Sequence, residues 1–103
     1  MTERKHRIVL VDDDPDLLRL ISIRLRTEGY DVKAVESAAE ALDVVPQFRP
    51  ELVVTDLRME GMDGIGLLRE LHKRFSGLRV VLLTAHGTIP DAVEATQLGA
   101  FGF

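Results

Sequence analysis

Two short apolar runs in this sequence each end in acidic residues that could act on one ligand. Residues 8–11 are followed by Asp12 and Asp13, and residues 52–54 lead through a threonine to Asp56. Short runs of β-branched residues are typical of strands buried on both faces, where a carboxylate would be costly to desolvate. At the carboxyl end of a strand the acid can face a crevice instead, and open α/β sheets bind ligands there. The pattern therefore predicts one shared acidic site.

The three acids are suited to a hard cation. Asp12 and Asp13 are adjacent, so the period of two along a strand makes their side chains diverge, and we expect one direct and one water-mediated contact. Mg²⁺ prefers oxygen ligands and keeps several waters, so Asp13, Asp56 and a main-chain carbonyl in the following loop would fit it. Without a cation the three carboxylates should repel and show raised, coupled pKa values. Asp14 is better explained as a helix cap.

A carboxylate beside Mg²⁺ can also be a nucleophile. Attack on phosphorus would form an acyl phosphate, and the metal would neutralise the charge of the transferring group. A third apolar run, residues 80–83, ends in Thr84, whose hydroxyl could donate to a phosphate oxygen. The alternative for Thr84 is a strand residue whose hydroxyl is satisfied by the main chain. Its place at a strand end favours the phosphate contact.

Composition excludes several classes of protein. The chain has 103 residues, 46% of them hydrophobic, which is enough for one domain with a core. A net charge of −4 argues against a nucleic-acid-binding surface, and the basic cluster at residues 4–7 is expected to be a solvated tail. There is no cysteine, which fits a reducing compartment, and no apolar run long enough to span a membrane. We therefore expect a cytoplasmic domain that binds neither nucleic acid nor membrane.

Strands and helices are predicted to alternate along the chain, so the sheet should be parallel. The first helix should begin at Asp14 and Pro15, carry an inner stripe from Leu17 through Leu25, and end at Gly29. The predicted strands cover residues 8–11, 31–36, 52–55 and 78–83, and a fifth begins at 100.

The remaining helices follow the same logic. Ser37 should cap a second helix, and Pro46 with Pro50 should bracket the connection that follows it. The third helix should cover about residues 65–75, and a fourth should run from 88 to 98. We expect a single domain over residues 1–103 that stops at the start of its fifth strand and lacks a last helix.

The chain resembles the receiver domain of bacterial two-component response regulators, and within that family the nitrogen-regulator-like subgroup attached to sigma-54-dependent activators. The likeness covers essentially all 103 residues. The matching stretches are Val9 to Asp14, Thr55 to Met59, Gly61 to Gly64, Leu83 to Gly87, and Ala92-Val93 followed by Gly99 to Phe101.

This resemblance implies a flavodoxin-like, doubly wound sheet of order 2-1-3-4-5, an order already known for receivers. It implies that Asp56 accepts a phosphoryl group from a histidine kinase. It also implies that Mg²⁺ is held by Asp12, Asp13, Asp56 and the main-chain carbonyl of Arg58. The partners would be a sensor histidine kinase and the output domains of a longer transcription regulator.

The resemblance further implies a switch, in which Thr84 moves toward the phosphoryl group and an aromatic residue, here Phe103, follows. Arg58 and His86 occupy positions that tune the lifetime of the phosphoryl group, or are simply exposed loop residues. The family pattern has proline where this chain has Glu60, so the loop after Asp56 should be less rigid.

A phosphate-contacting lysine is expected three residues beyond Phe103, past the end of the chain. Its absence predicts slower phosphorylation and a weakened switch in this polypeptide. The apolar sheet surface left by a missing last helix would favour self-association, as a homodimer paired at the open edge.

Two other functions remain open from the sequence. A Mg²⁺-dependent phosphohydrolase with an aspartyl nucleophile usually has a second acid two residues later, and Arg58 stands there instead. A phosphorylation-independent interaction module is the other alternative. The interpretation that we prefer is a signalling switch rather than an enzyme.

Overall fold

The computed structural model describes residues 5–83 of the chain, and these form a four-stranded sheet with three helices. Strands and helices alternate as predicted. In chain order the elements are β1 (Arg7–Val11), α1 (Pro15–Thr27), β2 (Asp31–Val35), α2 (Ala38–Phe48), β3 (Leu52–Thr55), α3 (Gly64–Arg74) and β4 (Arg79–Leu82). The fourth helix and fifth strand that we expected fall outside the described residues.

All strand pairs of the sheet are parallel, in the order β2-β1-β3-β4. This is the predicted order for the four strands that the structure describes. In the register, Val11 at the end of β1 lies beside Val35 of β2 and Thr55 of β3. The three strands therefore end level with one another, and the residues that follow them share one edge of the sheet.

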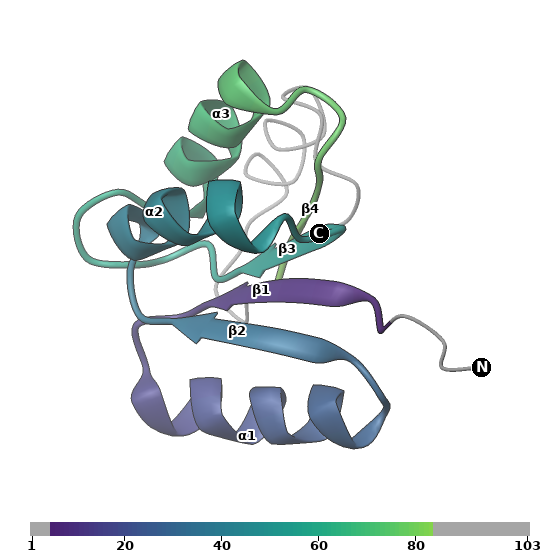
Figure 1. The fold of residues 1–103 in the computed structure, drawn as a ribbon. Coiled ribbons are helices and arrows are strands. Elements are labelled where there is room, and N and C mark those ends of the chain that lie inside the picture. The colour runs from purple at the N-terminus through teal and green to yellow at the C-terminus, as the bar shows by residue number, and fades with distance from the viewer. Residues whose placement is uncertain (1–4, 84–103) are drawn as a thin grey trace.

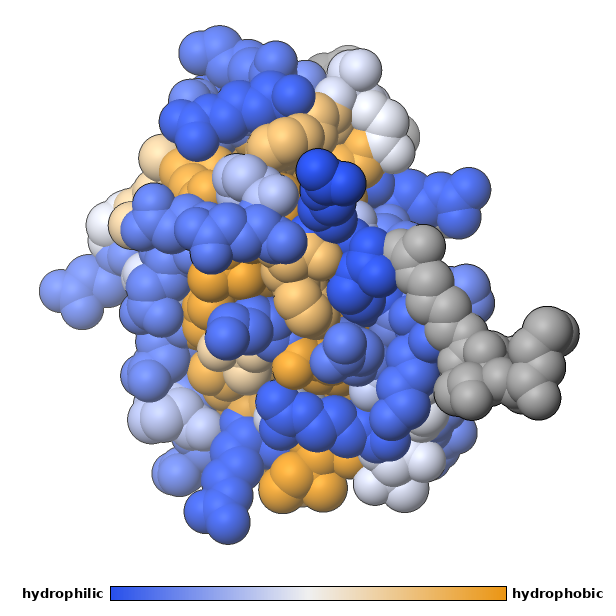
Figure 2. All heavy atoms as spheres, in the orientation of Figure 1, coloured by the Kyte–Doolittle hydropathy of each residue, from blue (hydrophilic) through white to orange (hydrophobic). Residues whose placement is uncertain are grey.

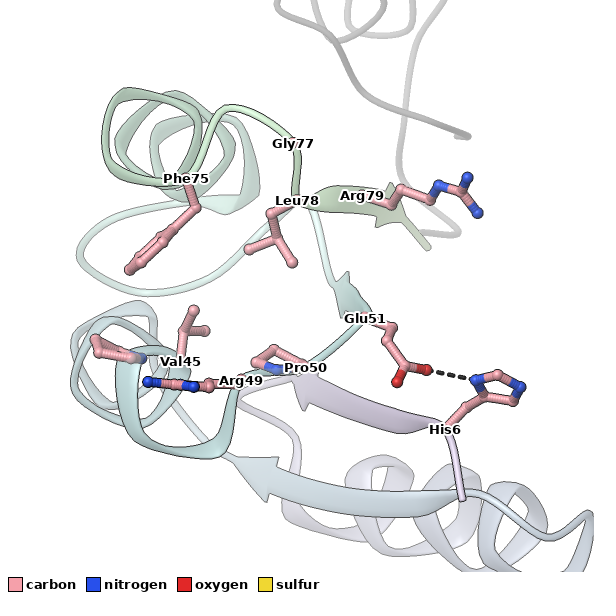
Figure 3. Close-up of a pocket in the computed structure, with 10 residues that line it drawn as sticks. His6, Val45, Arg49, Pro50, Glu51, Phe75, Gly77, Leu78 and Arg79 are labelled. Atoms are coloured by element: carbon pink, nitrogen blue, oxygen red, sulfur yellow. Dashed lines mark hydrogen bonds and ion pairs between the residues drawn. The ribbon is translucent and has the colours of Figure 1, made fainter. Parts of the chain in front are cut away.

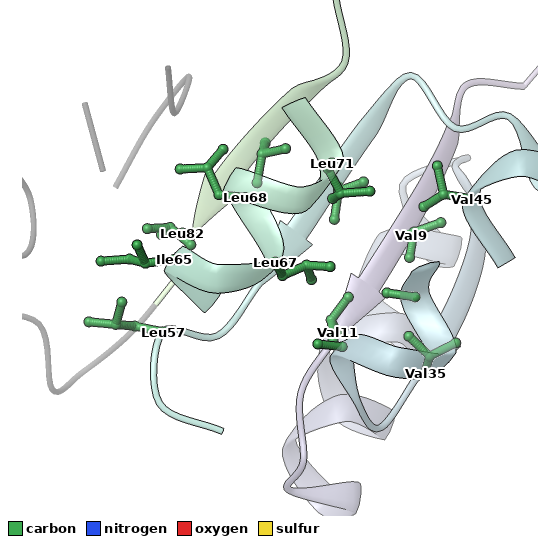
Figure 4. Packing of buried hydrophobic residues seen from close by; sticks show 14 residues of the cluster. Val9, Val11, Val35, Val45, Leu57, Ile65, Leu67, Leu68, Leu71 and Leu82 are labelled. Carbon is green, nitrogen blue, oxygen red and sulfur yellow. The ribbon is translucent and has the colours of Figure 1, made fainter. Parts of the chain in front are cut away.

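The helices cover both faces of the sheet (Figure 1). Helix α1 packs on one face against β1 and β2, and α2 and α3 lie on the other. The larger core fills the space under α2 and α3, with fully buried Leu67, Leu68 and Leu71 from α3 meeting Val9 and Val53 of the sheet (Figure 4). Helix α1 closes a smaller core. This two-sided packing explains why the strands are continuous apolar runs.

The predicted helix ends are confirmed by the hydrogen bonds that satisfy them. The Asp14 carboxylate accepts from the main-chain N–H groups of Asp16 and Leu17, which makes Asp14 the N-cap of α1. The Ser37 hydroxyl accepts from the N–H of Glu40 at the start of α2. After α1 the chain turns at Gly29, whose φ of +97° lies in the left-handed region that glycine adopts without strain.

Two predictions about side-chain position were wrong. Leu17 is not on the inner stripe of α1, because its side chain is 42% exposed while Leu18 and Ser22 are buried. Neighbouring positions on a helix differ by 100°, so only one of Leu17 and Leu18 can face the sheet. The basic segment before β1 is not wholly a solvated tail either, because Arg7 is the first residue of β1 and is partly buried.

Pro46 was expected in the connection after α2 but lies inside the helix, which continues to Phe48. Proline removes one helical hydrogen bond. A partner from another element stabilises this helix end: the Arg7 guanidinium donates to the main-chain oxygen of Phe48 at 2.8 Å and to that of Arg49 at 2.8 and 3.0 Å. Local sequence patterns could not predict this contact of Arg7, because its partners lie 41 and 42 positions away in the sequence.

The face shown in Figure 2 is mostly hydrophilic, with apolar patches between charged side chains. None of the helices among residues 5–83 has the length and apolar character that crossing a bilayer requires.

Candidate functional site

The three predicted acids meet at the carboxyl edge of the sheet. Asp12 and Asp13 follow β1, Asp56 follows β3, and one carboxylate oxygen from each lies within 4.8 Å of those of the other two. The main-chain N–H of Asp56 donates to the oxygen of Val11 at 3.0 Å, which extends the β1–β3 pairing to the site itself. The expectation that these three acids lie together at one edge of the sheet is therefore confirmed.

Asp12 is the buried member of the cluster, with 6% of its surface exposed. Its main-chain N–H bonds to Val35 of β2, and its carboxylate accepts from the N–H of Asp14 at 2.9 Å. Burial raises the pKa of Asp12 above its ordinary value, and the negative charges of Asp56, Asp13 and Asp14 raise it further, while the hydrogen bond from Asp14 acts in the opposite direction. A bound cation would relieve both the burial cost and the repulsion.

Asp13 differs from adjacent Asp12 in its exposure, which fits the alternation of side chains expected along a strand. It is exposed, and its carboxylate accepts a hydrogen bond from the main-chain N–H of Glu60 at 3.2 Å. Asp14 is occupied as the cap of α1 and is not part of the cluster. Sequence reasoning did not find the contact between Asp13 and Glu60, because no local pattern reports on a main-chain donor 47 positions away.

The loop from β3 to α3 is fixed where it leaves Asp56. Gly64 at the start of α3 lies directly against the main-chain oxygen of Asp56, and its N–H donates to the oxygen of Leu57 at 2.9 Å. Leu57 is itself buried in the core, and Asp63 caps α3 by accepting from Gly66. Asp56 is partly exposed, so its carboxylate is accessible to a reactant, and its main chain contacts Val11 and Gly64.

The donor set of this cluster suits Mg²⁺. Three carboxylates at one edge offer hard oxygen ligands, and exposed Asp13 and partly exposed Asp56 leave room for waters that Mg²⁺ retains. Arg58, whose main-chain carbonyl we predicted as a further ligand, lies in the loop after Asp56 with an exposed side chain. The predicted residues Thr84, His86 and Phe103 lie outside the described part of the chain.

A hollow of about 830 Å³ lies at the opposite edge of the sheet, between the ends of α2 and α3 (Figure 3). Val45, Pro50, Phe75 and Leu78 give it apolar walls, and a hydrogen bond between His6 and Glu51 lies at its rim. Open α/β sheets bind their ligands at the carboxyl ends of the strands. We therefore take the acidic cluster, rather than this hollow, as the candidate site.

Comparison with known proteins agrees with this geometry. A family model described as the response regulator receiver domain matches residues 8–103. The transcriptional regulatory protein GlrR of Escherichia coli strain K12 is 50% identical over 103 residues, which are 100% of this chain and 23% of that protein. The chain thus spans about a quarter of the length of this curated relative.

Solved structures give the same result. The crystal structure of NtrX from Brucella abortus superposes with a TM-score of 0.89 at 34% identity, covering 97% of this chain and 23% of that one. Chemotaxis protein CheY4 of Vibrio cholerae, at 22% identity and a TM-score of 0.92, covers 96% of this chain and 84% of its own and supports the fold alone. The predicted likenesses to receivers and to their nitrogen-regulator-like subgroup are confirmed. The chain belongs to the response regulator receiver domain family.

Proposed function

We propose that this domain is a phosphorylation-activated switch in which Asp56 accepts a phosphoryl group from a sensor histidine kinase. The observation that carries the proposal is the convergence of Asp12, Asp13 and Asp56 within 4.8 Å at the carboxyl edge of the sheet. Of the three, Asp56 combines partial exposure with a main chain fixed from both sides, by Val11 and by Gly64. A nucleophile needs both accessibility and orientation.

The transfer of the phosphoryl group is a single displacement at phosphorus. A carboxylate oxygen of Asp56 attacks phosphorus, the bond between phosphorus and the donor's imidazole nitrogen breaks, and that nitrogen leaves with the electron pair. The product is an aspartyl phosphate. Asp12 and Asp13, together with Asp56 and the Arg58 carbonyl, would hold Mg²⁺ at the same edge. When bound, Mg²⁺ supplies positive charge that offsets the charge of the phosphoryl oxygens.

The downstream response is part of the same proposal. Thr84 would report the phosphoryl group, Phe103 would follow it, and Arg58 and His86 would set its lifetime. The response would pass to output domains of a longer protein and regulate transcription. GlrR, which is named as a transcriptional regulatory protein and is about four times longer than the matched region, supports this placement.

Intact mass after incubation with acetyl phosphate tests the proposal. With Mg²⁺ the protein should gain about 80 Da, the mass of one phosphoryl group, and lose it to hydroxylamine, as acyl phosphates do. Asp56→Ala should show no gain. Asp43→Ala, an exposed acid on α2 away from the cluster, should behave like the wild type. A gain that survives Asp56→Ala, or no gain in a longer form of the protein, would overturn the assignment of Asp56.

A further inference from the structure

One hydrogen bond joins the two loops that carry the acidic cluster. The main-chain N–H of Glu60 donates to Oδ2 of Asp13 at 3.2 Å, linking the loop after β3 to the loop after β1. In the described part of the chain this is the only hydrogen bond of the Asp13 carboxylate. Buried Asp12, by contrast, is held by its surroundings and by the N–H of Asp14. Asp13 is exposed, so its orientation depends on the bond from Glu60.

A single N–H donor orients a carboxylate without using up its binding capacity. The two oxygens of Asp13 offer about four lone-pair directions, so several remain for a cation after one is bonded to Glu60. An exposed side chain without such a bond would lose rotamer freedom when it binds a ligand, and that loss weakens binding. Hydrogen bonds that orient metal ligands commonly strengthen metal binding for this reason.

We propose that the main-chain N–H of Glu60 is a positioning group, which holds the Asp13 carboxylate ready for the cation and couples the loop after β3 to cation binding. The proposal rests on the Mg²⁺ site of the proposed function. Because the coupling is a free energy between two parts of the molecule, it acts in both directions. Cation binding should therefore also order the loop around Glu60.

The local backbone allows a direct test. Gly61, next to Glu60, has a φ of +78°, in the left-handed region that glycine adopts without strain, and it is kept in both variants below. Proline has no N–H to donate, so Glu60→Pro deletes the donor. Glu60→Ala keeps the donor, and both variants lack the Glu60 carboxylate. The two variants therefore differ in the N–H and in the stiffer backbone of proline, and the amide measurement below separates these two effects because it uses no proline.

Calorimetric titration with Mg²⁺ measures the effect on binding directly. We expect Glu60→Pro to bind Mg²⁺ roughly three- to tenfold more weakly than Glu60→Ala, below the roughly 10- to 100-fold typical of groups that orient metal ligands, because Asp13 is exposed. Equal or tighter binding by Glu60→Pro would overturn the inference and leave the proposed function standing. Absence of Mg²⁺ binding by the wild type would overturn both.

Nuclear magnetic resonance supplies a readout that needs neither proline nor metal. In the metal-free protein the Glu60 amide should exchange with solvent more slowly than the amide of Gly61. In Asp13→Ala, which removes the acceptor, Glu60 exchange should accelerate and its proton resonance should move upfield. An unchanged Glu60 amide in this variant would show that the bond does not form in solution and would overturn the inference, even if Glu60→Pro failed to fold.

Discussion

Gly64 packs directly against the main-chain oxygen of Asp56, with no room for a side chain between them. A Cβ on Gly64 would lie well inside van der Waals distance of that oxygen and 3.0 Å from the Cα of Leu57. Both neighbours are main-chain atoms, which cannot rotate away as a side chain could. The start of α3 and the end of β3 that carries Asp56 are therefore packed as one unit.

Gly64→Ala should for this reason destabilise the fold and shift Asp56. We expect a loss of about 1–3 kcal/mol in the free energy of unfolding, as for overpacked sites, despite the better helix propensity of alanine. Urea denaturation measures the loss. Gly77→Ala is the matched control, because a Cβ there meets nothing within 4 Å, and it should be neutral or slightly stabilising. Similar stability of the two variants would contradict the close packing.

Asp12 should make the stability of the metal-free domain fall as pH rises. Its pKa is raised in the folded state, chiefly by burial, so the folded state binds a proton more tightly than the unfolded state. Stability is then lost progressively as pH rises from the ordinary value of 3.8 through the folded pKa. Asp12→Asn keeps the acceptor oxygen for Asp14 but cannot ionise.

The measurement is urea denaturation of the wild type and Asp12→Asn in EDTA across the acid to neutral range. The two should be equally stable at the most acidic pH, and Asp12→Asn should be the more stable near pH 7. A wild type that remains as stable as Asp12→Asn at neutral pH would show that the carboxylate carries no ionisation cost in this site.

Mg²⁺ should stabilise the folded domain, and EDTA should reverse the effect. A ligand that binds only the folded state at 100 times its dissociation constant contributes about 2.7 kcal/mol, which raises Tm by roughly 10–20 °C in a domain of this size. Thermal unfolding with and without Mg²⁺ measures this. The shift should shrink in Asp13→Asn and persist in Asp43→Asn. An equal shift in both variants would mean that Mg²⁺ acts outside the acidic cluster.

Arg7 should contribute to stability far from the acidic site. Its guanidinium donates to the main-chain oxygens of Phe48 and Arg49, so Arg7→Ala should leave the end of α2 unsatisfied and cost about 1–3 kcal/mol of unfolding free energy. Arg7→Lys should recover only part of this, because an ammonium lacks the planar fork of donors. Exposed Lys5→Ala is the control and should change little. A loss in Lys5→Ala as large as that in Arg7→Ala would point to general charge effects.

Local sequence patterns were enough to predict the alternation of strands and helices, the caps at Asp14 and Ser37, and the edge at which Asp12, Asp13 and Asp56 meet. These features are local or follow from the level ends of parallel strands, so hydrophobic periodicity and capping chemistry report them directly. The same local logic failed at Pro46 and Leu17. The Arg7 contact stabilises the end of α2 beyond Pro46, and the sheet selects which face of α1 is buried.

The different environments of the three acids arise from contacts between distant parts of the chain. Asp12 is the buried acid with a raised pKa, bonded to Val35 of β2 and to the N–H of Asp14, whereas adjacent Asp13 is exposed. The bond from Glu60 to Asp13 and the packing of Gly64 on Asp56 also arise when loops from separate strands meet. Contacts between distant segments leave no periodic trace in the sequence, so residue type could place the acids but could not assign their environments.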